Sequence, residues 1–396
     1  MTLARLDTPL LRRALLAAFV AVHVLAVLAP ADVLAPVDPW RLGRMVWHGH
    51  VPYRDFALEY PPGSVLAFLL PAAVPHGLAR AVLALEAVAA EAAVMWWVLR
   101  PVPGAVWRWI PLSLMLFPFL AGGFDAFPMA AAAGSTALLA AGAASGWAVA
   151  GLGAAMKLSP GGAWVWGRAR PAAAAAVLVV TAAVLVAPAF LARHPDDSYL
   201  GYSLHRGVQV ESVAASTVWV GRALTGGTSR FAYRFKAYEI DGAGGAAAVW
   251  ALAGLAGLAA VAVRSGRRGP PDPWLAAFTT LVLILLANKV LSPQFIAWPA
   301  PLAAVLGGRW FRAWLLVAAL TLAAYLGSGP TWILACAAVR NVALVGVAAA
   351  GLRALWISPP SSGRPGTAAS GSSPPPGTRP PAPGTPPGEP APPSAR

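Results

Sequence analysis

The chain has 396 residues, of which 58% are hydrophobic and only 11% are charged. Soluble globular chains carry about 25% charged residues, so this chain has too few charges to cover a water-exposed surface of its size. The composition therefore excludes a soluble globular enzyme and a disordered protein for roughly the first 355 residues. It predicts an all-α, polytopic integral membrane protein.

The formal net charge is +14, from 29 basic and 15 acidic residues. The arginines lie mainly in short segments between apolar runs, where they orient membrane spans by the positive-inside rule. Because no basic stripe with interleaved aromatic residues is present, we expect no nucleic-acid partner. Cys336 is the only cysteine, which excludes an intrachain disulfide and disfavours a structural zinc site.

The N-terminal segment carries Arg12 and Arg13 and continues into an apolar run, Ala14 to Pro30. This run is long for a signal peptide and lacks a clear cleavage site, so it is interpreted as a retained first span. A span needs about 20 apolar residues, and we expect a bundle of about 10–12 membrane helices. Twelve candidate spans are at 13–30, 62–76, 78–99, 108–121, 126–144, 147–163, 171–192, 244–263, 273–290, 294–307, 310–326 and 331–352.

With the N-terminus inside, the most basic short loops fall on the cytoplasmic side. Arg100 and Arg108 disagree, because this count places them outside, and the same count places Asp125 on the inner side. Two long loops, 31–61 and 193–243, then lie on the outer face and hold nine of the 15 carboxylates. The aromatic residues of the second loop predict ordered structure with interfacial helices.

Residues 357–396 are dominated by Pro, Gly, Ser, Thr and Ala. Such a segment has little to bury, which predicts a disordered, polyproline-like cytoplasmic tail after a transmembrane domain at 1–356. We expect deletion of the tail to leave the activity of the membrane domain intact.

The first outer loop offers three carboxylates that could act as a base. Asp38 lies shortly after the first span, and Asp55 and Glu59 are four residues apart, so a short helix would place those two on one face. A carboxylate at the membrane surface beside aromatic residues is partly desolvated, which raises its pKa and suits it to accept a proton from an alcohol. The alternative is that they are ordinary loop carboxylates paired with neighbouring arginines.

The second outer loop contains His205-Arg-Gly-Val-Gln-Val-Glu-Ser212. Arg206 could hold a phosphate bidentately, or could simply pair with Glu211. On a helix Arg206, Gln209 and Glu211 would not share a face, so they would converge only in a loop or a broken helix.

A third segment, Asn288-Lys-Val-Leu-Ser-Pro-Gln-Phe295, places Lys289 between two spans on the outer side. Polar residues at membrane depth are costly and by default mark a site. Snorkelling to the headgroups is the alternative for Lys289, but it does not explain Asn288 or Gln294.

Three further signals are weaker. Glu86 and Glu91 lie within a candidate span, and Lys157 with Ser159-Pro160 breaks another.

The sequence has no Walker loop, no Rossmann glycine pattern and no His-x-x-x-His zinc pair. ATP-driven transport and soluble nucleotide-sugar chemistry are therefore unsupported.

Three motifs in order carry a resemblance to a known family. They are Asp38 followed by Gly49-His-Val-Pro-Tyr-Arg-Asp-Phe-Ala-Leu-Glu-Tyr-Pro-Pro62, then Arg206–Ser212, then Asn288–Gln294. Together they resemble the family 87 glycosyltransferases, integral membrane enzymes of the GT-C class typified by actinobacterial polyprenyl-phosphate-dependent mannosyltransferases. The similarity runs from about residue 13 to 350 and omits the tail.

The resemblance implies a GT-C-like bundle and a hexose donor, mannose by analogy, attached to a polyprenyl phosphate. It implies transfer with inversion to a hydroxyl of a glycolipid or glycan acceptor. Asp38 matches the catalytic base by position, with Asp55 and Glu59 as the next candidates. Arg206 and Lys289 are the candidate cations over the departing phosphate.

The other polar and aromatic side chains of these segments are the candidate substrate-binding residues, namely Tyr53, Tyr60, His205, Gln209, Glu211, Asn288 and Gln294. No redox cofactor is required, and a divalent cation, although compatible with the chemistry, has no clear ligand set. We expect a multi-pass protein surrounded by the lipids of the plasma membrane, with its active site on the extracytoplasmic face.

Two other classes of function remain open from the sequence. A secondary transporter or lipid flippase would use Glu86 and Glu91 as intramembrane proton carriers around a site at the bilayer midplane. A non-catalytic scaffold of envelope assembly would use the Pro-rich tail as a docking segment.

Overall fold

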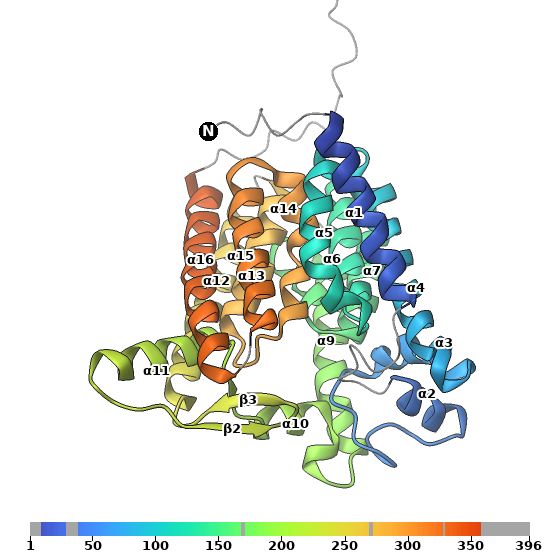
Figure 1. Cartoon of the computed structure of the whole chain (residues 1–396), viewed down its shortest axis with the longest axis vertical. Helices are drawn as coiled ribbons and strands as arrows, with labels where there is room; N and C mark the ends of the chain where they lie inside the picture. Colours follow the sequence, from blue (N-terminus) through green and yellow to red (C-terminus); the bar gives the residue numbers. More distant parts are fainter. Residues whose placement is uncertain (1–8, 29–38, 168–170, 269–271, 328, 358–396) are drawn as a thin grey trace, which may run out of the picture. The chain divides into compact units, whose positions relative to one another are not determined.

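The structure is a computed structural model that describes residues 9–28, 39–167, 171–268, 272–327 and 329–357. Most of the labelled helices above the loops run side by side along the vertical direction of Figure 1, and the short α8 belongs to the same part of the chain. They are α1 (Pro9–Leu28), α4 (His76–Ala93), α5 (Ala105–Ala121), α6 (Ala126–Ala140), α7 (Ser145–Met156), α8 (Ala163–Trp166), α9 (Pro171–Leu191), α12 (Gly244–Arg268), α13 (Pro273–Ala287), α14 (Ala300–Leu306), α15 (Gly308–Leu326) and α16 (Pro330–Ile357).

Among the described residues, six helical segments are long and apolar enough to cross a membrane: Pro9–Leu28, His76–Leu99, Pro171–Leu191, Gly244–Arg267, Gly308–Leu326 and Pro330–Ile357. Large apolar side chains such as Val20, Leu252 and Leu316 remain exposed on them. Hydrocarbon is the natural solvent for such surfaces, and a helix satisfies its own backbone groups there. The predicted all-α polytopic membrane fold is confirmed.

Aromatic and polar anchors hold the interior of the bundle. Trp314 is fully buried and donates its indole N–H to the carbonyl oxygen of Ile296 at 3.0 Å. Glu91 is also buried, and its carboxylate accepts a hydrogen bond from Trp109 at 2.7 Å and contacts His23 Nε2 at 2.8 Å. Since a buried carboxylate without partners is very costly, these contacts explain how Glu91 is tolerated between α1, α4 and α5.

The candidate span 62–76 is not a membrane span. Its residues form a short 3₁₀ turn, η3 (Pro62–Val65), and α3 (Leu66–Ala73). Together, Pro62–Ala73 extend only about 20 Å, less than the roughly 30 Å of a bilayer core. Instead α3 packs against α2 (Pro39–Trp47), where Trp47 donates to the carbonyl oxygen of Leu69 at 3.2 Å.

Because residues 62–76 do not cross the bundle, several later residues lie at the opposite end of it from the one expected. Because α3 stays at one end, the chain enters α4 there and returns through η4 (Val94–Leu99) to the end where α1 begins. Arg12 lies 5.1 Å from the Trp107 ring centroid, and Arg108 donates to the carbonyl oxygen of Ala304 at 2.6 Å. The prediction that Arg100 and Arg108 lie opposite to the N-terminus was therefore wrong, and we call this end of the bundle the basic end.

Asp125 likewise lies at the opposite end from the predicted one. It follows α5, which runs away from the basic end, and it binds Lys157 after α7. The candidate span 147–163 is broken there, as the Lys157 and Ser159-Pro160 pattern predicts. Lys157 is extended, and η5 (Ser159–Gly162) and α8 follow it.

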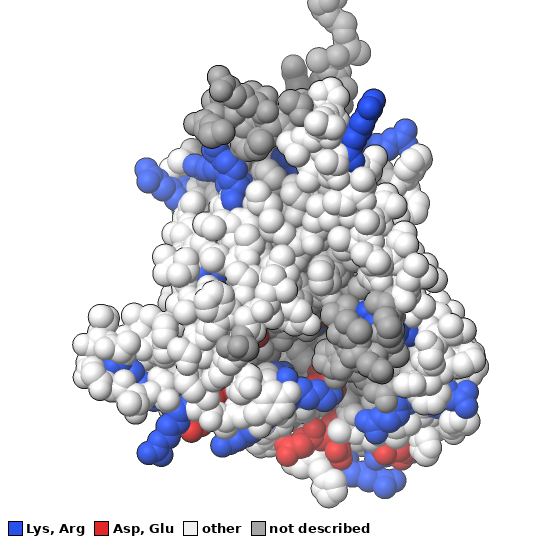
Figure 2. Space-filling model, in the orientation of Figure 1, with Lys and Arg blue, Asp and Glu red and all other residues white. Residues whose placement is uncertain are grey.

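The end opposite to the basic end carries the two long loops, and we call it the loop end. Its second loop forms η6 (Pro195–Asp197), α10 (Tyr199–His205), β1 (Val208–Gln209), α11 (Val213–Leu224), β2 (Phe231–Arg234) and β3 (Ala237–Ile240). The strands form one antiparallel sheet in the order β1-β3-β2. In the face shown in Figure 2, the Asp and Glu side chains gather over this end.

Local sequence signals explain why the second loop has regular structure. Ser198 caps α10 by accepting a hydrogen bond from the Gly201 N–H, and Ser212 caps α11 in the same way from Ala215. Phe235 and Lys236 join β2 to β3 with φ values of 49° and 59°, the left-handed geometry of a tight hairpin. The second loop is ordered and contains the helices α10 and α11, but the sheet was not predicted. The predicted tail after residue 357 lies outside the described residues.

Candidate functional site

Two cavities at the loop end share the side chain of Arg206. The first, which we call the polar cavity, has a volume of about 440 Å³ and is lined by Glu59, Tyr60, Asp125 and residues of the second loop. The second, which we call the apolar groove, has a volume of about 720 Å³ and lies along α12 and α13. Arg206 lines both, so one cation stands where a polar and an apolar compartment meet.

The apolar groove is walled by small and aliphatic side chains. Ala247, Ala251 and Leu258 of α12 face Ile284 and Ala287 of α13 across it. The side chains of such residues offer no hydrogen bonds. The groove therefore suits an alkyl or isoprenoid chain better than a polar molecule.

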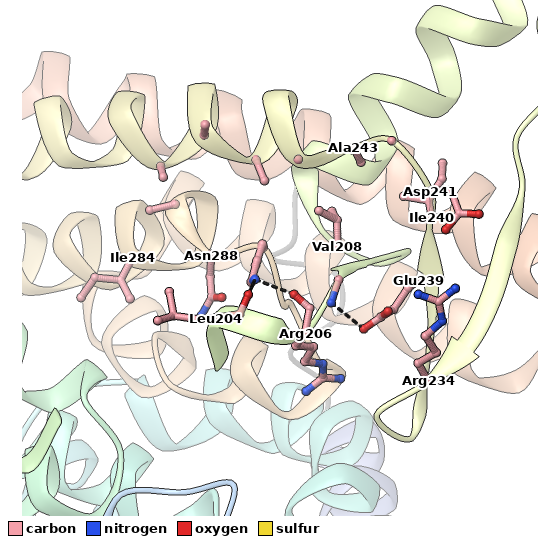
Figure 3. Close-up of a pocket in the computed structure, with 18 of the residues that line it drawn as sticks. Leu204, Arg206, Val208, Arg234, Glu239, Ile240, Asp241, Ala243, Ile284 and Asn288 are labelled. Carbon is pink, nitrogen blue, oxygen red and sulfur yellow. Dashed lines mark hydrogen bonds between the residues drawn. The ribbon is translucent and has the colours of Figure 1, made fainter. Parts of the chain in front are cut away.

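Polar groups also line the apolar groove, among them Arg206, Glu239 and Asn288 in Figure 3. Lys289 donates to the carbonyl oxygens of Leu204 at 3.0 Å and Arg206 at 2.5 Å. Glu239 accepts from the Gly207 N–H at 2.9 Å. Both sets of contacts hold the backbone around Arg206, and neither involves its guanidinium group.

The Arg206 side chain has capacity to bind an anion. Its Nε is buried and has no hydrogen-bond partner in the part of the chain that the structure describes. Its guanidinium carbon lies 6.0 Å from the Tyr202 ring centroid. Glu211 accepts a hydrogen bond from Gln209 at 2.6 Å, and the charge of Arg206 acts on its carboxyl group.

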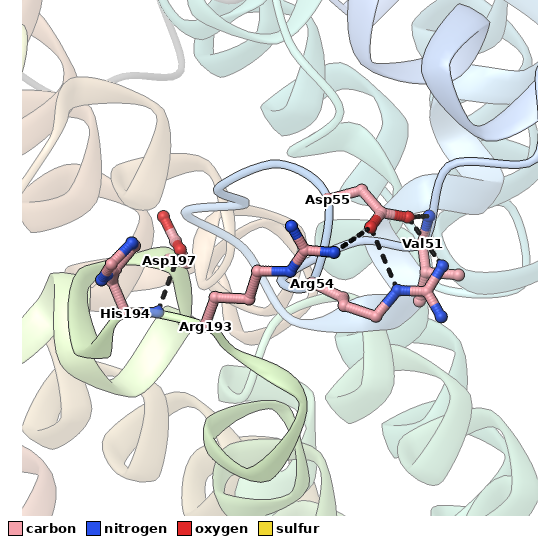
Figure 4. A network of polar contacts seen from close by, with 6 residues as sticks. All are labelled: Val51, Arg54, Asp55, Arg193, His194 and Asp197. Atoms are coloured by element: carbon pink, nitrogen blue, oxygen red, sulfur yellow. Dashed lines mark hydrogen bonds and ion pairs between the residues drawn. The ribbon is translucent and has the colours of Figure 1, made fainter.

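The Asp55 carboxylate already has hydrogen-bond and ion-pair partners in both loops (Figure 4). Its carboxylate accepts two hydrogen bonds from Arg54, at 3.0 and 2.9 Å, one from the Val51 N–H at 2.8 Å and one from Arg193 at 3.5 Å. The Arg54 hydrogen bonds and the Val51 N–H hold the pKa of Asp55 well below its usual range. Asp55 lines neither cavity. Residues 51–60 form turns rather than the short helix considered from the sequence.

Glu59 lines the polar cavity and is surrounded by donors. Lys236, at the tip of the β2–β3 hairpin, donates to it at 3.1 Å. Burial alone would raise the pKa of Glu59, but hydrogen bonds with Tyr202, Lys236 and Tyr60 outweigh burial and lower it. Glu59 is thus ionised at neutral pH, and it ties the hairpin to the first loop.

Gln209 and Glu211 line the polar cavity near α16. The backbone carbonyl of Glu211 accepts hydrogen bonds from Arg340 and from Asn341, the latter at 3.1 Å. Burial raises the pKa of Glu211 to about 7, although the charges of Arg340 and Arg206 act in the opposite direction. This carboxyl group therefore changes its charge near neutral pH.

A pH dependence of stability follows from Glu211. Its pKa in the folded protein exceeds that of an ordinary glutamate, so the native state gains stability from the bound proton, and this gain is lost as the pH rises through about 7. The melting temperature of the wild type, minus that of Glu211→Gln, should fall between about pH 4.5 and pH 7 and change little above that range. Thermal melts of both proteins in the same detergent measure this difference, and a constant difference would contradict the assignment.

The other predicted site residues divide between the cavities and their surroundings. Gln294 lines the polar cavity, and Asn288 lines the apolar groove. Tyr53 is buried and donates its hydroxyl to the carbonyl oxygen of Tyr60 at 2.6 Å, so it holds the first loop without lining either cavity. His205 is exposed and pairs with Asp196. Asp38 lies outside the described residues.

Sequence reasoning missed parts of the polar cavity. Asp125 was assigned to the wrong end of the bundle, although it lies on the cavity wall. Tyr233, Phe235 and Tyr238 of the hairpin also line it. Asp125 was misplaced because residues 62–76 were counted as a membrane span. Pro71 interrupts this segment, and requiring the full length of a span would have placed Asp125 correctly.

No group of three or more His, Cys, Asp and Glu side chains within the described ranges could hold a metal ion. The polar cavity instead combines carboxylates, amides, tyrosines and one arginine beside an apolar groove. Such a set can bind hydroxyl groups and an anion attached to a hydrophobic chain.

Comparisons with known proteins agree with this chemistry. The family model of glycosyltransferase family 87 matches residues 58–293, more than half of the chain. Comparisons with curated proteins and with solved structures gave no match. The resemblance inferred from the three motifs is confirmed, and it favours an enzyme over the transporter and the scaffold considered from the sequence. The chain belongs to glycosyltransferase family 87 and is a multi-pass membrane glycosyltransferase.

Proposed function

We propose that this glycosyltransferase moves a hexose, mannose by analogy with its family, from a polyprenyl-phosphate donor to a hydroxyl group of a glycolipid or glycan. Transfer inverts the configuration at the anomeric carbon. The reaction takes place at the extracytoplasmic surface of the plasma membrane, in the polar cavity.

The observation that carries this proposal is the shared position of Arg206. A polyprenyl-phosphate sugar has an apolar chain, a phosphate and a polar sugar in that order. The apolar groove, Arg206 and the polar cavity follow the same order in the protein. A nucleotide-sugar donor would leave the apolar groove without a role.

The reaction requires one base and one cation. The base takes the proton of the acceptor hydroxyl, whose oxygen attacks the anomeric carbon from the face opposite to the phosphate. The bond between that carbon and the phosphate oxygen breaks, and polyprenyl phosphate leaves with the electron pair. Arg206 stabilises the charge that develops on it, and Lys289 holds Arg206 in place through the backbone.

Asp38 is the proposed base. The family resemblance assigns it this role, and the other two candidates have other partners. Asp55 lies outside both cavities between Arg54 and Arg193, and Glu59 accepts from Lys236 and from tyrosine hydroxyls. A carboxylate that already accepts several hydrogen bonds is a weak proton acceptor.

The distribution of charge supports the proposed orientation. Arg12 and Arg108 lie at the basic end, whereas the carboxylate-rich loops form the loop end. The positive-inside rule assigns the basic end to the cytoplasm. Labelling of a single cysteine introduced at exposed Thr228, in a Cys336→Ser background, would test this, because an impermeant reagent should reach it in intact cells.

The function is tested with purified protein in lipid nanodiscs. Radiolabelled mannose should move from polyprenyl-phosphate mannose to a glycolipid or oligosaccharide acceptor, and no transfer should occur from GDP-mannose. A heat-inactivated sample is the control. Transfer from GDP-mannose with none from the lipid-linked donor would reject the proposed donor class.

A further inference from the structure

Asp125 stands at the first turn of a helix but does not cap it. Asp is among the residues that most often cap a helix by accepting a hydrogen bond from an N–H of its first turn. Asp125 is the N-cap residue of α6, and its side chain accepts no such bond. Its carboxylate contacts Lys157 and Trp298 instead and lines the polar cavity. Asp125 therefore lacks the usual capping hydrogen bond, and its carboxylate lies at the polar cavity instead.

The partners of Asp125 all bind one oxygen. Lys157 donates to Oδ1 at 2.7 Å, and the Trp298 indole donates to the same Oδ1 at 3.0 Å. No described residue is seen to donate to Oδ2. Asp125 itself is 3% exposed, so this arrangement is built into the protein interior at the edge of the cavity.

Lys157 is held in an aromatic enclosure. Its Nζ lies 4.2 Å from the ring centroid of Phe295, 5.1 Å from Trp298, 5.2 Å from Phe124 and 5.8 Å from Tyr60. Aromatic faces attract a cation and also exclude water from it. A buried ion pair seldom stabilises a fold more than apolar residues of the same volume would, so stability alone does not account for this pair beside the cavity.

The space next to Oδ2 is open. A Cβ added to Gly123 would lie 4.0 Å from Asp125 Oδ2 and 4.0 Å from the carbonyl oxygen of Phe119, with no closer atom outside its immediate neighbours. Gly122 and Gly123 both line the polar cavity. The glycines thus leave room beside the carboxylate oxygen to which no described residue donates.

We propose that Asp125 is a sugar-binding residue whose Oδ2 accepts a hydrogen bond from a hydroxyl group of a pyranose ring lying over Gly123. Lys157 is its positioning residue, because it holds Oδ1 at 2.7 Å. This inference rests on the proposed function, which places a sugar in the polar cavity. The ring is either that of the donor or that of the acceptor, and the experiment separates the two.

The test fills the space beside Oδ2 without disturbing the ion pair. Gly123→Ala and Gly123→Val add side chains of increasing size there. Gly151→Ala and Gly151→Val are matched controls, because Gly151 of α7 has no atom within 4 Å of an added Cβ and lines neither cavity. A double variant, Asp125→Asn with Lys157→Met, removes both charges together, so that neither is left buried alone.

Three probes are measured by equilibrium binding to full-length protein in nanodiscs: polyprenyl-phosphate mannose, polyprenyl phosphate without a sugar, and methyl α-mannoside. Thermal melts of every variant establish that it is folded. If the donor sugar contacts Asp125, Gly123→Val and the double variant should bind polyprenyl-phosphate mannose at least about tenfold more weakly, with unchanged affinity for bare polyprenyl phosphate. If the acceptor sugar contacts Asp125, binding of methyl α-mannoside falls instead and donor binding is unchanged.

Unchanged affinity of folded Gly123→Val for both sugar-containing probes would overturn the assignment of Asp125. A wild-type protein that binds methyl α-mannoside but neither polyprenyl compound would contradict the proposed donor. In that case the response of methyl α-mannoside binding to Gly123→Val still decides the role of Asp125, so the two failures are distinguishable.

Discussion

Replacing Asp38 with asparagine is expected to lower the rate of sugar transfer on the order of 100- to 10,000-fold, the usual contribution of a general base. Asparagine has almost the same size and can still form hydrogen bonds, but it cannot accept the proton of the acceptor hydroxyl. Because binding does not need this proton transfer, kcat should fall while the affinity for polyprenyl-phosphate mannose stays within about threefold. Steady-state kinetics and donor binding in nanodiscs provide the two measurements.

Asp55→Asn and Glu59→Gln are the matched controls for this prediction. Asp55→Asn breaks ion pairs at the surface of the first loop. It should therefore lower the melting temperature and leave kcat largely unchanged. Glu59→Gln weakens the contact with Lys236 on the β2–β3 hairpin and should raise KM rather than abolish transfer. Near-normal kcat in Asp38→Asn together with a 100-fold loss in Glu59→Gln would transfer the role of base to Glu59.

The fold class could be predicted because composition alone requires a membrane solvent. The direction of individual segments was less secure, since it depended on counting short apolar runs. Residues 62–76 are apolar enough for a span, but α3 ends at Ala73 and lies beside α2. One miscounted segment placed Arg100, Arg108 and Asp125 at the wrong ends. Charge already pointed to this error, because Arg100 and Arg108 violated the positive-inside rule.

Short motifs identified the parts of the site that lie in one stretch of chain. Arg206, Gln209 and Glu211 meet in the polar cavity because Ser198 and Ser212 cap the helices on either side of β1. Contacts between distant segments could not be anticipated. Lys236 reaches Glu59 across 177 residues only because β2 and β3 fold into a hairpin. No local pattern in the sequence encodes such a pairing.

Replacing Arg206 with glutamine is expected to lower kcat/KM for the polyprenyl-phosphate donor about 100- to 1,000-fold, comparable to the loss of one preorganised donor in an oxyanion site. The guanidinium group is the cation that lines both cavities, and its buried Nε is free to meet a phosphate oxygen. Arg206→Lys should recover only part of the rate, because an ammonium group cannot form the planar pair of hydrogen bonds with a phosphate. Kinetics with polyprenyl-phosphate mannose at constant ionic strength measure both variants.

The role of Arg206 is separated from a general effect of charge by Arg230→Gln, which removes an exposed arginine of the same loop that lines neither cavity. This variant should keep kcat/KM within about twofold. Lys289→Met should act through the Arg206 backbone, giving a smaller loss together with a lower melting temperature. Equal losses in Arg206→Gln and Arg230→Gln would mean that the loop end attracts anionic lipids in general. The phosphate would then have to be bound elsewhere, and the order of groove, cation and cavity would no longer explain the choice of donor.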